Sequence, residues 1–137
     1  MTTHYALVIS SGFFLVPAIC AFLQGDRLIG GVLGITSLVS GAYWWNPVHG
    51  FVRNLDLVVS KVSFCIMAYH GFAILTTPFD FTYGILICGS MCGFYSSACI
   101  SYRENDPLWW VFYFVFHFQT AYLQWYIVMR LGEYLGK

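Results

Sequence analysis

Residues 5–23 have the sequence YALVISSGFFLVPAICAFL, a run of 19 residues without a charged side chain. As a helix this run extends about 28 Å, which matches the roughly 30 Å hydrocarbon core of a bilayer. Four more apolar runs follow, over residues 28–45, 57–75, 81–100 and 108–128. We therefore predict about five transmembrane helices. The N-terminus lacks the Lys/Arg-rich region of a signal peptide, so we expect the first run to be a retained span.

The composition excludes an ordinary soluble domain. Of 137 residues, 59% are hydrophobic, 20% aromatic and 9% charged, whereas about a quarter of the residues of a soluble domain are charged. Six basic and six acidic side chains give a net charge of zero, so we expect no nucleic-acid partner. The sequence predicts one domain, residues 1–137, folded as an all-α integral membrane helical bundle with short loops. It carries no signal for a plasma, organelle or viral membrane.

Residues that typically start helices separate the apolar runs. A capping side chain precedes each later run, and in three cases a proline follows it, at Asp26, Asn46-Pro47, Thr77-Pro78 and Asp106-Pro107. Pro17 lies inside the first run and predicts a kink there. If the third helix starts at Pro47, it extends for 29 residues to Leu75. Arg53 and Asp56 would then share one face of that helix as a solvated ion pair.

Small residues form two ridges at helical spacing. The first consists of Gly30, Gly34 and Gly41, with Ser37 between them, and the second of Gly89, Gly93 and Ser97. Such ridges let helices approach closely in lipid. We expect them to serve packing inside the bundle, and the alternative is a seam with another protein chain.

Two histidines lie within the apolar runs, and each belongs to a polar stripe at helical spacing. One stripe comprises Asp56, Ser60, Ser63, Met67 and His70, and the other comprises Trp110, Tyr113, His117, Thr120 and Gln124. We expect both stripes to face protein, with neutral imidazoles that hydrogen-bond across the bundle.

The alternative is that His70 and His117 bind one metal, as a bis-histidine haem or as part of a zinc site. Further zinc ligands could come from Cys88 and Cys92, which share a helix face, or from His49 and Asp56. We expect the cysteines to act as small apolar residues. No cofactor is predicted, although bound lipids are expected, and no residue is assigned a catalytic role.

One stretch resembles a known family. Ser37, Ser40, Tyr43 and Trp44, followed by Leu55-Asp56, resemble the metal-hydrolase superfamily of alkaline ceramidases and adiponectin-type receptors. That resemblance implies a seven-helix fold with a zinc site built from Ser-x-x-x-His, an Asp and a late His-x-x-x-His. Here Trp44 stands four residues after Ser40 and Ala121 four after His117. The resemblance therefore implies a degenerate member that cannot bind metal as the family does, and it assigns no site residue.

Aromatic residues close the second run and open the fifth, as expected for interfacial belts. They are Tyr43, Trp44, Trp45, Trp109 and Trp110. The fifth run continues with aromatics on every face, which favours a wide contact surface. We predict a non-catalytic structural or accessory subunit that packs with other subunits in a membrane assembly. The alternatives are the metal or haem site and a small channel or carrier.

Overall fold

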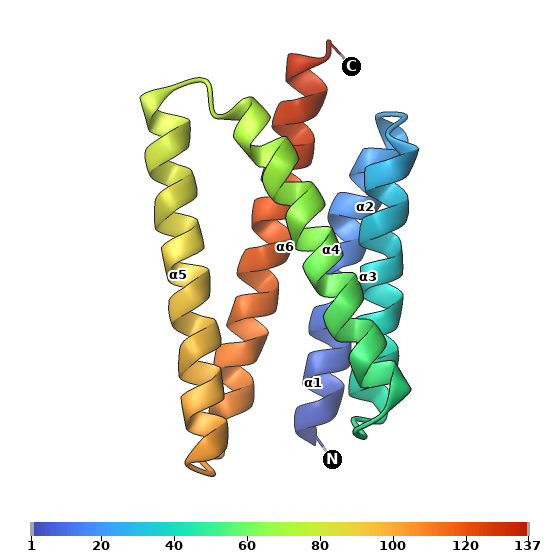
Figure 1. Ribbon diagram of the computed structural model, residues 1–137, viewed down its shortest axis with the longest axis vertical. Helices are drawn as coiled ribbons and strands as arrows, with labels where there is room; N and C mark the ends of the chain where they lie inside the picture. Colours follow the sequence, from blue (N-terminus) through green and yellow to red (C-terminus); the bar gives the residue numbers. More distant parts are fainter. Residues whose placement is uncertain (1, 137) are drawn as a thin grey trace.

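The computed structural model describes residues 2–136, and over this range it consists of helices and short connections without a strand. The elements are α1 (Thr2–Ser11), the 3₁₀ helix η1 (Gly12–Phe14), α2 (Leu15–Leu23), α3 (Arg27–Trp45), α4 (Phe51–Ile74), α5 (Pro78–Arg103) and α6 (Trp109–Tyr134). The first three follow one another in a single rod, so residues 2–136 form five rods, whose arrangement is shown in Figure 1. The N-terminus and the C-terminus lie at opposite ends of the bundle (Figure 1).

Four of the five rods within residues 2–136 are long and apolar enough to cross a membrane. They are His4–Leu23, Arg27–Trp45, Phe51–Ile74 and Pro78–Arg103. The predicted fifth span, α6, has sufficient length at 26 residues but does not meet this criterion of apolarity, because it carries His117, Gln119 and Gln124 along with many tyrosines and tryptophans. The all-helical bundle is thus confirmed within residues 2–136, and α6 is the long helix in this range that does not qualify as a span.

The reason for this polarity is that α6 lies at the centre of the bundle. It packs against α1, α2, α4 and α5, whereas α5 packs mainly against α6. The buried apolar core lies around α6 and includes Ala18, Leu33, Met67, Ile127 and Val128. Only 17% of the most apolar segments of α4 and α5 is buried, against 39% for the first two rods. Consequently α4 and α5 turn most of their surface outward.

Two of the predicted helix starts are confirmed by their capping bonds. The Asp26 carboxylate accepts from the backbone N–H of Ile29 at 3.0 Å and begins α3. The Thr77 hydroxyl accepts from the backbone N–H of Asp80 at 3.1 Å, and Pro78 occupies the first turn of α5. Proline fits there because the first turn leaves its N–H groups unbonded.

The other two starts lie later than predicted. Helix α4 begins at Phe51 and has 24 residues, so the 29-residue helix from Pro47 is wrong. Asp106 accepts a bond from the Leu108 N–H at 2.8 Å within a turn, and α6 starts one residue further on. In both places one or more non-helical residues separate the proline from the first residue of the helix.

Pro17 changes the first rod in the way its chemistry requires. Proline cannot donate to the carbonyl four residues earlier, which here belongs to Phe13. The helix changes to 3₁₀ geometry over Gly12–Phe14 and returns to α geometry at Leu15. The irregular turn thus surrounds the carbonyl that the proline leaves without its helical donor.

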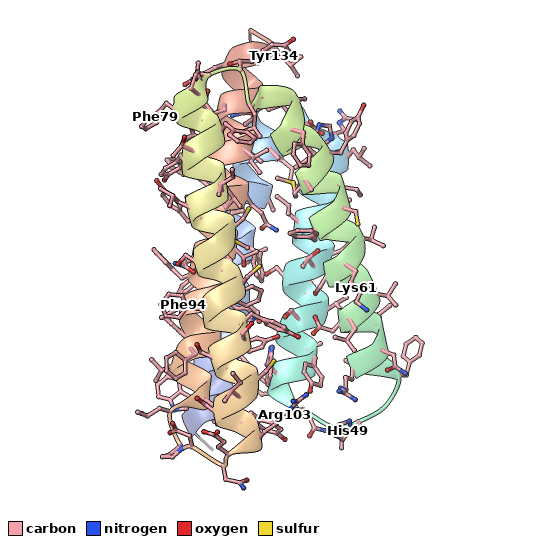
Figure 2. The ribbon with its side chains drawn as sticks, turned by 60° about the vertical axis from the view of Figure 1, so that its left-hand side comes forward. His49, Lys61, Phe79, Phe94, Arg103 and Tyr134 are labelled. Atoms are coloured by element: carbon pink, nitrogen blue, oxygen red, sulfur yellow. The ribbon has the colours of Figure 1, made fainter. Side chains whose placement is uncertain are left out.

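Charged side chains occur mainly near the ends of the rods. His49 and Arg103 lie at one end of the bundle, and Phe79 and Tyr134 at the other (Figure 2). Lys61 is exposed on the outer side of α4. The Arg53 guanidinium lies 2.8 Å from His49 Nδ1, whereas Asp56 is 7% exposed. The expected solvated pair of Arg53 with Asp56 is therefore wrong, because Asp56 turns into the bundle.

Candidate functional site

A buried histidine connects the first rod to the central helix. His117 is 4% exposed, and its Nδ1 lies 2.7 Å from Ser10 Oγ on α1. Phe14 and Tyr113 pack edge-on against the imidazole, with ring centroids 5.4 Å and 4.8 Å away. The imidazole thus bonds across the bundle, as its place in the polar stripe predicts.

Serine side chains extend this polar layer from α1 to α3. The Ser37 hydroxyl donates to the backbone carbonyl of Ser11 at 2.8 Å. The Ser11 hydroxyl lies 2.8 Å from the Leu7 carbonyl and 3.3 Å from Ser40 Oγ. These hydrogen bonds can form only when the helices are at one axial position relative to one another. The layer therefore fixes the axial positions of α1, α3 and α6.

Asp56 lies next to this layer with incomplete bonding. Its Oδ1 is buried and has no hydrogen-bond partner among the described residues, although the hydroxyls of Ser40 and Ser60 lie beside the carboxyl group. The Ser63 hydroxyl and the Trp44 indole N–H are likewise buried without a partner in residues 2–136. The helical stripe identified Asp56 correctly as inward-facing, but the proximity of Arg53 in sequence suggested the wrong partner.

The structure does not bring His70 and His117 together. A Cβ added at Gly71, beside His70, would lie 3.2 Å from Ile127 Cδ1, so this part of α4 lies level with Ile127. His117 lies ten residues earlier on α6, about 15 Å away along the helix. The His70 ring packs against Tyr69 instead. Within the described chain, no group of three or more His, Cys, Asp or Glu side chains is arranged to hold a metal ion.

Polar side chains also bond α5 to α6 along much of their shared length. Gln119 Nε2 donates to Ser90 Oγ at 2.8 Å, and the Tyr83 hydroxyl donates to the Tyr122 hydroxyl at 2.8 Å. Nearer the end of the bundle, the Tyr126 hydroxyl donates to Asp80 Oδ1 at 2.9 Å. These bonds hold α5 at one depth relative to the central helix.

Asp80 is the centre of a charged cluster at this end. Its carboxylate accepts from the Thr77 hydroxyl at 2.7 Å and from Arg130 at 3.3 Å, in addition to Tyr126. Arg130 also donates to Glu133 at 2.9 Å. The single arginine is therefore shared between two carboxylates, and the three groups together carry one negative charge.

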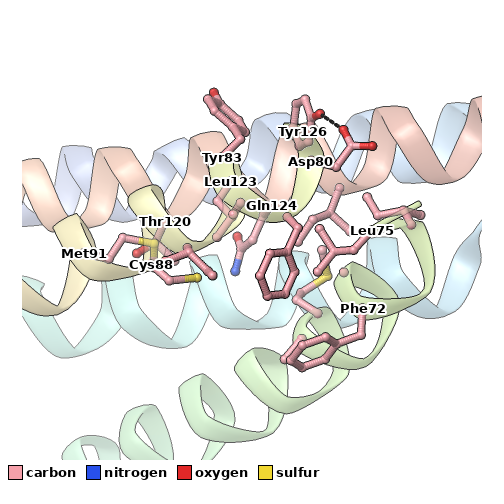
Figure 3. Close-up of a pocket in the computed structure, with 18 of the residues that line it drawn as sticks. Phe72, Leu75, Asp80, Tyr83, Cys88, Met91, Thr120, Leu123, Gln124 and Tyr126 are labelled. Carbon is pink, nitrogen blue, oxygen red and sulfur yellow. Dashed lines mark hydrogen bonds between the residues drawn. The ribbon is translucent and has the colours of Figure 1, made fainter. Parts of the chain in front are cut away.

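A groove lies between α4, α5 and α6 below this cluster. It has a volume of about 450 Å³ and extends along α5 from Asp80 to Met91. Its walls are largely apolar, and they include Met67, Phe72, Leu75 and Leu123 (Figure 3). Gln124 also lines it, although this residue is 6% exposed and its Oε1 has no partner in the described chain. The helical spacing of the polar residues predicted that Gln124 faces inward. It could not indicate that a cavity lies there.

The two small-residue ridges have different surroundings. A Cβ at Gly30 would lie 2.8 Å from Phe22 on α2, so this glycine allows close packing of α2 on α3. At Gly34, Gly41, Gly89 and Gly93, no side chain or other element of the described chain lies within 4 Å of that position. Gly89 and Gly93 are exposed on α5, and Ser97 is half-buried.

The predicted belt aromatics gather at the end of the bundle where α3 ends and α6 begins. Trp44 is buried and packs against Tyr43, Trp109 and Tyr113. Trp45 is exposed and contacts Tyr5, and Trp110 is half-buried. Part of the expected belt is therefore a packed aromatic cluster inside the bundle.

The chain matches none of the protein-family models, curated proteins or solved structures with which it was compared. What can be said of its chemistry therefore comes from its own residues. They form a buried polar layer around His117, an apolar groove with one unpaired amide, and an outward α5 face that contains two glycines.

Proposed function

We propose that the chain is a non-catalytic subunit of a larger membrane assembly, with all five rods crossing the bilayer and the outer face of α5 docked against another subunit. One observation carries the proposal: Gly89 and Gly93 form a Gly-x-x-x-Gly ridge that is exposed and meets no other part of the described chain within 4 Å. In lipid, helices associate where small residues let their backbones approach.

The surface around the ridge supports the same conclusion. Ile85, Leu86 and Ile100 on α5 are more than half exposed, and an apolar surface of this kind needs lipid or protein against it. Membrane insertion of α6 is consistent with its polarity, because the surrounding rods cover His117 and Gln124.

The proposal can be tested by the size of the assembly in a mild detergent. We expect the wild-type chain to elute from its native membrane in a complex larger than one chain. The Gly89→Leu/Gly93→Leu variant should elute as a single folded chain, because the new side chains block the approach of a partner helix. Gly31→Leu is the matched control, since this α3 glycine also has open space around it but lies outside the ridge. Wild-type protein that is monomeric, or a complex that survives the double substitution, would contradict the proposal.

A further inference from the structure

The groove between α4, α5 and α6 has the size of a small-molecule site. Its volume of about 450 Å³ lies within the range of roughly 300 to 1,000 Å³ that is usual for ligand pockets. Its walls are largely apolar, so an occupant that is apolar along most of its length suits them.

The length and position of the groove match one leaflet of a bilayer. From Asp80 to Met91 along α5 it extends about 16 Å, close to half of a hydrocarbon core of about 30 Å. Its polar end, at Asp80, lies near the end of the bundle where α5 begins and α6 ends (Figure 1). Its apolar end lies towards the middle of the rods. A lipid from that leaflet would thus enter with its head at Asp80 and its body towards Met91.

Gln124 supplies the polar contact that such a lipid would make. Its side chain points from α6 into the groove (Figure 3), and its Oε1 has no partner within residues 2–136. Gln124 stands two residues before Tyr126 on α6, and Tyr126 bonds to Asp80. Gln124 therefore lies near the polar end of the groove. An unbonded buried amide is costly, and a donor from a ligand would relieve that cost.

The charges at the mouth of the groove indicate which head group fits. Arg130 is already bonded to both Asp80 and Glu133, so it leaves no uncompensated positive charge for a phosphate. A hydroxyl group is uncharged and both donates and accepts, so it can bond to either atom of the Gln124 amide. We propose that this groove binds a neutral membrane lipid whose single hydroxyl bonds to Gln124 and whose apolar body lies between α4 and α5.

Photocrosslinking to the purified full-length chain in lipid vesicles tests this proposal. The probes are a diazirine-bearing sterol and a diazirine-bearing diacylglycerol, each compared with its O-methyl ether, which lacks the donor. Phosphatidic acid with the same diazirine chains tests the charge argument. We expect adducts on groove residues with at least one hydroxyl probe, and the more efficient of the two identifies the lipid source. Labelling should fall about tenfold with the ether, as expected for one lost hydrogen bond in a buried site.

Two variants complete the test. Gln124→Leu should lower labelling by the hydroxyl probe to the level of the ether, whereas Gln119→Leu on the same helix should not, because Gln119 bonds to Ser90 outside the groove. Gly84→Leu should abolish labelling, since Gly84 lines the groove. Equal labelling by hydroxyl and ether probes on the wild-type chain, adducts outside the groove, or preferred labelling by phosphatidic acid would overturn the proposal. These outcomes are independent of whether α5 docks against another subunit.

Discussion

The contact between α2 and α3 can be tested with two adjacent glycines that differ in their surroundings. A Cβ at Gly30 would lie 2.8, 2.9 and 3.0 Å from three ring atoms of Phe22. At Gly31, no side chain or other element in the described chain lies within 4 Å of the added atom. Replacing either glycine with alanine in a helix gains up to about 1 kcal/mol of intrinsic propensity. That gain cancels when Gly30→Ala is compared with Gly31→Ala, so the difference between the two variants isolates the clash with Phe22.

The magnitude follows from the distances. Carbon atoms pack at roughly 3.5 to 4.0 Å, so Phe22 or the α3 backbone must move by more than half an ångström in the Gly30→Ala variant. Overpacking of this kind costs about 1 to 3 kcal/mol. The Phe22 side chain is half exposed and can swing outward, so we expect the lower half of this range.

The assay is reversible unfolding in mixed detergent micelles by titration with dodecyl sulfate, followed by circular dichroism. We expect Gly30→Ala to have a free energy of unfolding about 1 to 2 kcal/mol below that of Gly31→Ala. In a Phe22→Ala background this difference should disappear, because the atoms that clash are gone. Equal stability of the two alanine variants in the wild-type background would refute the α2–α3 packing described above.

Three further results are expected. A double-mutant cycle of Ser10→Ala and His117→Phe in the same unfolding assay should give a coupling free energy of about 0.6 to 1.7 kcal/mol, and a value near zero would mean that the two side chains are not bonded. Asp80→Asn should lower the free energy of unfolding more than Glu133→Gln does, because Asp80 accepts from Thr77, Tyr126 and Arg130, whereas Glu133 forms a single exposed pair; equal losses would contradict this cluster. Protease-cleavable tags at the two ends of the chain should be accessible from opposite sides of the membrane, because an odd number of crossings places the ends on opposite sides. Accessibility of both tags from one side would exclude five crossings.

Features that depend on one helix were largely predictable from the sequence, although the starts predicted at Asn46-Pro47 and Asp106-Pro107 were wrong. Asp26 and Thr77-Pro78 begin helices as expected, because a cap requires only residues within the same turn. The inward direction of Asp56, His117 and Gln124 follows from their spacing, because a helical stripe has one orientation.

Features that depend on two helices were not predictable in this way. A stripe does not fix the axial position of one helix against another, so His70 and His117 could be taken as partners although they lie at different heights. The groove escaped prediction for a related reason. It exists because α4 and α5 both contact α6 while leaving space between themselves, and the sequence pattern of each helix gives no information about that space.

The central position of α6 has a consequence for biosynthesis. This helix follows in chain order all the helices against which it packs, so in the proposed membrane arrangement α1, α2, α4 and α5 enter the bilayer before their common partner exists. Helices α1, α2 and α3 can pair early through their own contacts, but α5 must wait in lipid with Asp80, Tyr83 and Ser90 unbonded to α6. Closure of the bundle is therefore a late event, and any delay in the synthesis of the last helix leaves the earlier helices without the contacts that join them.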